Sequence, residues 1–307
     1  MTKVFIDGSV GTTGLRIVER LIRRRDIELI SLPEELRKNV EARREKLNEA
    51  EIVFLCLPDD AARESVSLIE NDTTKVIDTS TAHRTADGWA YGFPELSGRR
   101  EKIVTSKRVA NPGCHASGVI ALVAPLVEKG IIAEDIALSA VSLTGYSGGG
   151  KKMIAEYEGE GRDALLDAPR MYGLSQSHKH IPEILKICGL SKAPVFSPIV
   201  APFYSGMEVI VSLAYEDFSA SVDEIKKLYS EYYSNGLVRF NDSADENGFL
   251  SAGKYSGRDD MEISVFGNED RLTLVSRFDN LGKGASGAAI QNMNILLGVD
   301  EKTGLDV

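Results

Sequence analysis

The chain has 307 residues, of which 43% are hydrophobic and 27% are charged, a composition typical of a globular protein with ample material for a core. Its formal net charge of −10 has the wrong sign for a general nucleic-acid binder, which neutralises phosphates with Lys and Arg. No apolar run approaches the roughly 18 residues of a membrane helix, and no signal-peptide pattern precedes the first strand-like run. We therefore expect a cytoplasmic protein without nucleic-acid or membrane partners.

The first third of the chain alternates short apolar runs with stretches of helix length. Helices are expected from about Thr13 and from about Glu34. The strand-like runs lie at residues 4–7, 27–32, 52–57, 75–78 and 108–110. Such alternation predicts βαβ units around a parallel sheet. The turn at residues 111–113 then opens a long apolar helix from Cys114 towards Glu128.

The pattern changes beyond about Ile136. Strand-like runs at residues 207–216 and 271–279 alternate apolar and polar positions partly by twos, as half-buried antiparallel strands do. A second domain of α+β type is therefore expected. The tail at residues 281–297 is rich in Gly and Ala and then turns helical, which suits a helix that packs tightly against another element or a ligand.

A glycine-rich loop follows the first predicted strand and opens the first predicted helix. Its GxxGxxG spacing is a variant of the dinucleotide-binding fingerprint, in which backbone N–H groups approach a pyrophosphate at a helix amino terminus. A plain tight turn has similar residues, but the place of the loop in the first βα unit favours a cofactor site. The predicted cofactor contacts in this loop are Gly8, Gly11, Thr12, Thr13 and Gly14.

The second predicted strand leaves the choice of dinucleotide open. It ends without the acidic residue that usually holds the adenine ribose of NAD, although Glu34 and Glu35 follow closely. Arg16, Arg37 and Lys38 suit a 2′-phosphate, but each also suits an ordinary solvated helix face. These residues favour NADP only slightly.

Cys114 is the most informative of the three cysteines. It follows a Pro-Gly turn and starts a helix, where unsatisfied N–H groups stabilise a thiolate, so we interpret it as a nucleophile. Cys56 lies inside an apolar run and Cys188 near a helix end before Gly189, and both are interpreted as small buried thiols. Their odd number and wide spacing predict neither a disulfide framework nor a metal site.

A thiolate nucleophile needs an acid/base partner, and the chain has four histidines. His178 and His180 precede a predicted helix start. In an extended segment, rings two residues apart cannot point at one spot, so we expect one to be catalytic and the other a ligand or spacer. His115 adjoins Cys114, but a neighbour in a helix points about 100° away.

Two further segments offer anion contacts. The Gly-rich stretch at residues 144–152 provides backbone amides and two lysines, which suit an acyl or phosphate oxygen, although a flexible connection has a similar composition. The run at residues 78–84 lies at the carboxyl end of a parallel strand, where α/β sheets bind ligands. In this run Arg84 can clamp a carboxylate or phosphate, or form a surface ion pair.

These motifs together resemble the N-acetyl-gamma-glutamyl-phosphate reductases, and in particular the shorter branch of that family. The Asn-Pro-Gly-Cys element is the most specific, because the similar aspartate-semialdehyde and glyceraldehyde-phosphate dehydrogenases carry different residues around their cysteine. The segment after the second strand departs from the longer branch, so the 2′-phosphate ligands are not carried over. The matching segments cover nearly the whole chain in order: residues 8–14, 111–115, 145–149, 178–183 and 279–284.

The resemblance implies an NADP-dependent step of arginine biosynthesis, in which N-acetylglutamyl phosphate is reduced to the semialdehyde with release of phosphate. It implies that Cys114 forms a thioester and that His178, six residues after Tyr172, moves the proton. The implied substrate contacts are Arg84, Asn111, Ser147, Gly148, Gly149 and His180. The further implied cofactor contacts are Ser80, Asn280 and Gly284.

The fold implied by the resemblance is α/β and has three parts. A Rossmann-type NADP-binding domain spans residues 1–112, an α+β catalytic and dimerisation domain spans residues 113–283, and a C-terminal helix at residues 284–307 returns to the first domain. A homo-oligomer, either a dimer or a tetramer, with a small-molecule substrate is expected.

Three alternatives remain open from the sequence. The same chemistry on an aminoadipyl phosphate would place the protein in lysine biosynthesis. A Cys/His acyl hydrolase would use the same nucleophile but has no use for the early glycine loop. A redox-sensing Rossmann protein would keep that loop but does not need Cys114 at a helix start with a histidine pair downstream.

Overall fold

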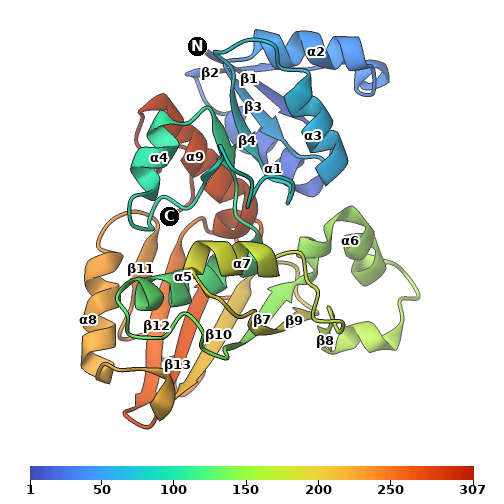
Figure 1. The fold of residues 1–307 in the computed structure, drawn as a ribbon. Coiled ribbons are helices and arrows are strands. Elements are labelled where there is room, and N and C mark those ends of the chain that lie inside the picture. The colour runs from blue at the N-terminus through green and yellow to red at the C-terminus, as the bar shows by residue number, and fades with distance from the viewer. The chain divides into compact units, whose positions relative to one another are not determined.

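The computed structural model describes all residues from 1 to 307, which form two compact units. The first unit consists of Met1–Pro112 together with Ala285–Leu305. The second unit consists of Gly113–Gly284 together with Asp306–Val307. Each unit is built around a β-sheet of its own (Figure 1).

The first unit contains a six-stranded sheet in which every neighbouring pair of strands is parallel. The strand order reverses between β1 and β3, which creates the switch point where open α/β sheets bind their ligands. The predicted strands at residues 75–78 and 108–110 match β4 and β6. The strands are, in spatial order, β2 (Ile27–Ile30), β1 (Thr2–Asp7), β3 (Ile52–Leu55), β4 (Lys75–Asp78), β6 (Arg108–Ala110) and β5 (Ala90–Tyr91).

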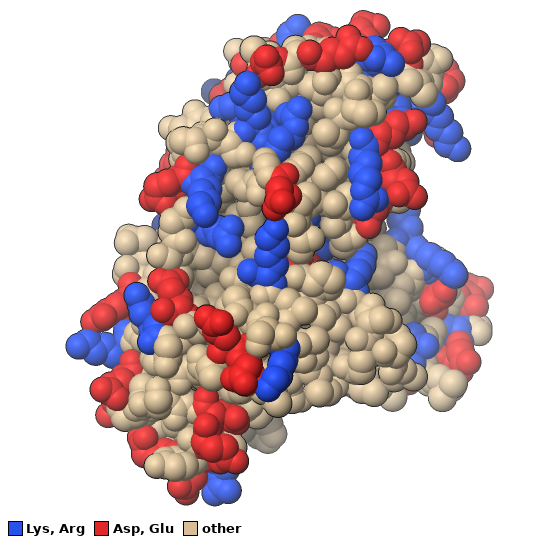
Figure 2. All heavy atoms as spheres, viewed as in Figure 1, with Lys and Arg blue, Asp and Glu red and all other residues tan.

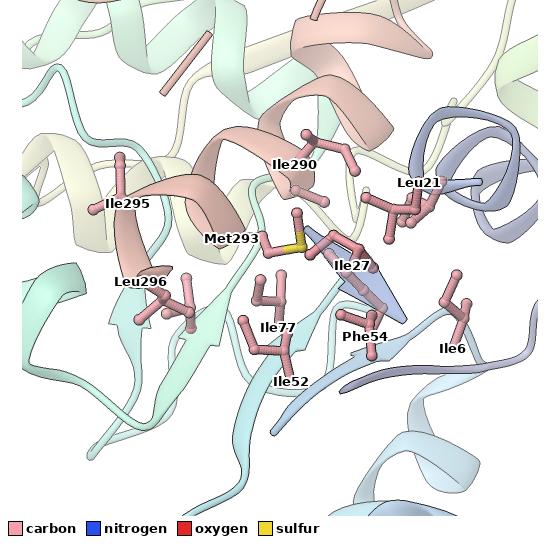
Figure 3. Packing of buried hydrophobic residues seen from close by; sticks show 14 of the residues in the cluster. Ile6, Leu21, Ile27, Ile52, Phe54, Ile77, Ile290, Met293, Ile295 and Leu296 are labelled. Carbon is pink, nitrogen blue, oxygen red and sulfur yellow. The ribbon is translucent and has the colours of Figure 1, made fainter. Parts of the chain in front are cut away.

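Helices cover both faces of this sheet because strand residues alternate between two apolar clusters. One cluster joins Ile6, Ile52 and Phe54 to α1, α4 and α9, whereas the other joins Val53 and Leu55 to α2 and α3. Figure 3 shows Ile290 and Met293 of α9 packed towards the sheet. The expected return of the C-terminal helix to the first domain is confirmed. The helices are α1 (Thr12–Leu21), η1 (Glu34–Leu36), α2 (Val40–Glu49), α3 (Asp59–Ser67), α4 (Arg99–Thr105) and α9 (Gly287–Leu297).

The second unit contains a mixed sheet of seven strands. Strands β12, β13, β10 and β7 pair antiparallel in succession, whereas β7 with β9 and β11 with β12 pair parallel. The expected α+β class of the second domain is therefore confirmed. In spatial order the strands are β11 (Val238–Phe240), β12 (Met261–Asn268), β13 (Arg271–Phe278), β10 (Met207–Ala214), β7 (Ser139–Gly145), β9 (Val195–Ala201) and β8 (Arg170–Met171).

The long helix α5 (Cys114–Glu128) packs on β10 and β13 of this sheet. Gly118 permits the close approach, since a Cβ there would lie 2.4 Å from the Val209 side chain. Figure 2 shows acidic side chains gathered at the end of this unit that carries α8. None of the helices combines the length and hydropathy needed to cross a lipid bilayer. The other helices are η2 (Tyr146–Gly149), α6 (Gly150–Glu158), η3 (Ala164–Asp167), α7 (Ile181–Cys188), η4 (Tyr215–Asp217), α8 (Val222–Tyr232) and the π-helical η5 (Gly282–Ser286).

Candidate active site

Cys114 is the first residue of α5, where the sequence predicted a helix start. The preceding Gly113 is extended, with φ −77° and ψ 145°, and provides no side chain to cap the helix. The backbone N–H of Gly113 instead donates to the Glu183 carboxylate at 3.2 Å. The half-buried Cys114 thiol therefore lies at the positive end of a helix dipole, which favours its thiolate form.

The other two cysteines have surroundings that disfavour a thiolate. Burial raises the pKa of the Cys56 thiol to about 12, and burial also raises the pKa of the Cys188 thiol far above its ordinary value. Cys188 ends α7 directly before Gly189. Both thiols therefore stay protonated at neutral pH, which leaves Cys114 as the nucleophile candidate.

Three histidine rings meet beside the start of α5. The ring centroids of His178 and His180 are 4.7 Å apart, and each lies 5.6 Å from the His115 ring. The His115 ring, which we expected to point about 100° away from Cys114, packs against both rings of the pair. The segment at residues 178–180 is also not extended, since the Ile181 N–H donates back to the His178 carbonyl at 3.0 Å. This turn allows both rings of the pair to reach one spot.

His115 is a buried, neutral link between two hydroxyl groups. Its Nδ1 lies 2.6 Å from the Ser142 hydroxyl and its Nε2 lies 2.6 Å from the Tyr172 hydroxyl. Burial lowers the pKa of His115 to about 3, so one ring nitrogen donates and the other accepts. Burial and the nearby Cys114 thiolate raise the pKa of Tyr172, so its hydroxyl stays protonated.

The backbone fixes the tautomer of His178. The His180 N–H donates to His178 Nδ1 at 3.2 Å, and a nitrogen that accepts a hydrogen bond carries no proton. Neutral His178 therefore carries its proton on Nε2. Such a ring presents an N–H donor, which is what a developing oxyanion requires.

The glycine loop after β7 brings together three predicted site residues. The Asn280 amide donates to the Ser147 hydroxyl at 2.9 Å and accepts the Gly206 N–H at 2.9 Å. A Cβ on Gly148 would lie 3.4 Å from the Asn280 amide nitrogen. Ser147 and Asn280 are both buried, so this contact fixes the loop.

Gly149 and Gly284 are each closely packed against a neighbouring side chain. A Cβ on Gly149 would lie 2.5 Å from the Met153 sulfur, and a Cβ on Gly284 would lie 3.0 Å from Cys114 Cβ. The structure thus brings Gly284 next to the nucleophile candidate. Gly284 lies within the π-helical η5, which begins at Gly282 and leads directly into α9 at Gly287.

In the first unit, the glycine loop forms the turn from β1 into α1. Gly8 has φ +89°, and a Cβ on it would lie 2.3 Å from the Cys56 carbonyl oxygen. A Cβ on Gly14 would lie 2.5 Å from the Gly8 carbonyl oxygen, whereas the surroundings of Gly11 are less crowded. Thr12 and Thr13 begin α1. The loop therefore keeps its backbone close-packed at a helix amino terminus, which fits the pyrophosphate of a dinucleotide.

Residues after β4 form a second polar cluster in the first unit. The Asp78 carboxylate accepts from the Ser80 N–H at 2.9 Å and from the Ser80 hydroxyl at 2.7 Å, and it lies 2.6 Å from His83 Nδ1. The His83 ring stacks on Trp89 with centroids 4.0 Å apart. These contacts hold Ser80 and its loop at the carboxyl end of the sheet.

Arg84 and Asn111 are joined in the same unit. Arg84 donates from Nε to the Asn111 carbonyl at 3.0 Å and from a terminal nitrogen to the Thr79 carbonyl at 3.1 Å. The Asn111 amide donates to the Ala285 carbonyl at 3.0 Å. Two of the predicted substrate contacts thus lie side by side, where neighbouring parallel strands end.

Comparison with known proteins places these residues in a family. Residues 3–106 match the family model described as semialdehyde dehydrogenase, NAD binding domain, and residues 114–280 match the one described as semialdehyde dehydrogenase, dimerisation domain. An N-acetyl-gamma-glutamyl-phosphate reductase of Chelativorans sp. (strain BNC1) is 47% identical, covering 96% of this chain and 98% of its own. N-acetyl-gamma-glutamyl-phosphate reductase 2 of Nostoc sp. is 43% identical, covering 99% of both chains. The chain belongs to the N-acetyl-gamma-glutamyl-phosphate reductase family.

Solved structures of more distant proteins share the fold. Aspartate semialdehyde dehydrogenase II of Vibrio cholerae, complexed with ASA, has a TM-score of 0.72 at 15% identity and covers 97% of this chain and 98% of its own. The aspartate semialdehyde dehydrogenase of Candida albicans, solved with NADP, has a TM-score of 0.69 at 19% identity and covers 97% of this chain and 98% of its own. The fold class expected for a member of the reductase family is confirmed.

Several polar residues of the histidine cluster and its surroundings have no site signal in the sequence. The sequence did not predict a site role for Ser142, Glu183 or His115. Tyr172 was named only for its spacing of six residues from His178. Glu183 lies three residues after His180, in the first turn of the predicted helix. An acidic residue at that position is typical of any helix start, where it interacts with the dipole, so it does not by itself indicate a site. The packing of α7 against α5 brings the Glu183 carboxylate to the Gly113 N–H, one residue before Cys114.

Proposed function

We propose that the protein is an NADP-dependent N-acetyl-gamma-glutamyl-phosphate reductase, which forms N-acetylglutamate semialdehyde in arginine biosynthesis. The observation that carries the proposal is the cysteine at the start of α5 beside a cluster of three histidines. A thiolate with an N–H donor nearby suits acyl transfer. The relatives that match over nearly the full chain support the choice of substrate.

The first chemical step is acyl transfer to sulfur. The Cys114 thiolate attacks the carbonyl carbon of the acyl phosphate, the bond from that carbon to the phosphate oxygen breaks, and phosphate leaves. The helix dipole of α5 keeps the thiolate available before attack. The product of this step is a thioester on Cys114.

The second step reduces the thioester. NADPH, when bound, supplies the hydride for this reduction. His178 Nε2–H donates a hydrogen bond to the substrate oxygen as negative charge develops there. If the proton moves to that oxygen, it returns to His178 when the C–S bond breaks and the carbonyl forms. The aldehyde leaves, and the Cys114 thiolate is regenerated with the electron pair of the broken C–S bond.

The remaining predicted contacts keep the roles that the resemblance implies. Arg84, Asn111, Ser147, Gly148, Gly149 and His180 are proposed to bind the substrate. The glycine loop, Ser80, Asn280 and Gly284 are proposed to hold the cofactor, and the close-packed backbone at Gly8 and Gly14 supports this for the pyrophosphate.

A homo-oligomer is supported by the match of residues 114–280 to a dimerisation domain. Assembly as a dimer or a tetramer and a cytoplasmic location stay predictions.

The reverse reaction tests the proposal directly. Purified protein is mixed with N-acetylglutamate semialdehyde, NADP and phosphate, and formation of NADPH is followed by its absorbance. The reductase requires all three components. The aldehyde gives the hydride, NADP accepts it, and phosphate cleaves the thioester that forms. An acyl hydrolase or a cofactor sensor gives no phosphate-dependent signal, and such a result contradicts the proposal.

A further inference from the structure

Asn292 is a fully buried polar side chain in the middle of α9, a helix whose apolar residues pack towards the sheet of the first unit. Its amide nitrogen donates to the Gly92 carbonyl at 2.9 Å and to the Asn111 side-chain oxygen at 3.2 Å. Its own amide oxygen is buried and has no hydrogen-bond partner. A buried acceptor without a partner costs free energy, so stability alone does not explain an amide at this position.

The chain makes room for this amide at Gly92, the residue after β5. A Cβ on Gly92 would lie 2.4 Å from the Asn292 amide nitrogen, a distance that no real Cβ contact reaches. The Gly92 N–H donates to the Ala110 carbonyl at 2.8 Å, so the pairing of β5 with β6 continues to this residue. Because the Gly92 carbonyl oxygen can only accept, the atom of Asn292 that faces it is the nitrogen.

This assignment also fixes the amide of Asn111. Since Asn292 presents N–H groups, the atom of Asn111 that faces it is the oxygen. The Asn111 nitrogen then lies on the other side of its amide, where it donates to the Ala285 carbonyl at 3.0 Å. An amide nitrogen carries two hydrogens, and the structure gives a partner to one of them. Asn111 can therefore donate one further N–H to a ligand.

We propose that Asn292 is a positioning residue, which sets the direction of the Asn111 amide so that an N–H, and not an oxygen, faces the substrate. The ligand atom at this place is then an acceptor, such as a carbonyl, carboxylate or phosphate oxygen. The substrate contact of Asn111 rests on the proposed function, whereas the orientation of Asn111 by Asn292 does not.

Asn294 provides a matched control on the same helix. It is also fully buried, but both ends of its amide have partners. Its nitrogen donates to the Glu301 and Thr303 carbonyls at 3.0 Å and 2.9 Å, and its oxygen accepts from Arg24 at 2.6 Å. None of these contacts involves Asn111, so a change at Asn294 tests stability without changing the orientation of Asn111.

NMR of the ligand-free protein tests the orientation. Protein labelled with ¹⁵N-asparagine gives a pair of side-chain signals for each amide, and Asn111→Ala identifies the pair from Asn111. We expect this pair to shift in Asn292→Leu, which fills the space but cannot donate, and to stay in place in Asn294→Leu. Asn292→Ser, which is too short to keep both contacts, should give the same shift if the leucine variant does not fold. An unchanged Asn111 pair, or an equal shift in the control, overturns the proposal.

Stability and activity should rank the two leucine variants in opposite order. Asn294→Leu breaks three hydrogen bonds, so it should lower the urea midpoint more than Asn292→Leu, which also removes the unpartnered oxygen. In the reverse assay, Asn292→Leu should lower kcat/KM for the semialdehyde about 10-fold, equal to about 1.4 kcal/mol, whereas Asn294→Leu should leave it unchanged. The same order in both measurements would make Asn292 a purely structural residue and overturn the proposal.

A double variant tests whether Asn292 acts through Asn111. Asn111→Ala removes the amide itself, so the addition of Asn292→Leu should lower kcat/KM no further. A further loss overturns the proposal. If the wild-type protein shows no phosphate-dependent reaction, the proposed function fails, while the amide signals still decide the role of Asn292.

Discussion

His115 Nε2 and the Tyr172 hydroxyl lie 2.6 Å apart in the second unit. The Ser142 hydroxyl lies 2.6 Å from the other ring nitrogen, and burial lowers the pKa of the imidazole to about 3, so the ring stays neutral. The neutral ring holds the Tyr172 hydroxyl in place, and burial together with the nearby Cys114 thiolate raises the pKa of that hydroxyl. The residue next to the nucleophile thus orients a polar group of the same cluster.

The buried His115 predicts a pH-dependent stability. Its pKa of about 3 in the folded protein lies below the ordinary value of 6.5, so between these values the unfolded chain binds a proton that the folded chain does not. The contribution is complete above about pH 6.5 and is lost as the pH falls. Between about pH 8 and about pH 5 the free energy of unfolding should fall by about 2 kcal/mol from this residue.

Urea unfolding of wild-type protein and of His115→Gln at both pH values measures this contribution. Glutamine is neutral throughout and can both donate and accept, so the variant should lose less stability on acidification than the wild-type protein does. Parallel losses in the two proteins would contradict the buried neutral histidine.

The regular elements of the first unit were predictable because their residues carry local signals. Strands β4 and β6 consist of the residues expected, since apolar runs bounded by turn residues have little freedom. The two-residue β5 was not expected, because Ala90 and Tyr91 are too short a run for any pattern. The charged segment from Glu34 divides into η1 and α2, and Asn39 caps the second of these through the Ala42 N–H.

The candidate site was predictable only in part. Cys114 has a signal in its own neighbourhood, a Pro-Gly turn before an apolar helix, and the structure begins α5 at that residue. The partners of His115 are distant in sequence, with Ser142 on β7 and Tyr172 after β8, so no spacing rule connects them. Contacts of this kind depend on how the sheet and helices pack, which periodicity does not encode.

Cys114 should carry the covalent chemistry. Replacing Cys114 with Ser should lower turnover by several orders of magnitude while the cofactor still binds, because a hydroxyl is a far weaker nucleophile than a thiolate at neutral pH. Turnover in the reverse assay and cofactor binding by fluorescence measure the two effects. Cys56→Ala and Cys188→Ala are the controls and should retain most activity, and near-normal turnover of Cys114→Ser would exclude the thioester route.

The two histidines of the pair should give different kinetic changes. His178→Asn keeps an acceptor for the His180 N–H but removes the Nε2–H, so kcat should fall by about 10²-fold or more with a modest change in KM. His180→Asn should mainly raise KM. Steady-state kinetics of both variants decide the assignment, and exchanged phenotypes would make His180 the proton carrier.

The cofactor should be NADP(H) rather than NAD(H). Strand β2 ends at Ile30 and is followed by Ser31 and Leu32, without an acidic residue to hold the ribose hydroxyls of NAD. The ratio of kcat/KM for NADPH and NADH measures the preference. A higher value for NADH would mean that Glu34 or Glu35 binds the ribose.

The acyl chain of the substrate should be glutamyl rather than the aminoadipyl chain, which is one methylene longer. A single methylene is worth only about 1–3 kcal/mol in a pocket, so both aldehydes can react and the preference can be as small as about 10-fold. Charge does not separate them, because both substrates carry the same anionic groups. The decisive measurement is kcat/KM for the two free semialdehydes with NADP and phosphate, side by side. A higher value for the longer aldehyde would assign the enzyme to lysine biosynthesis and leave the chemistry of Cys114 and His178 unchanged.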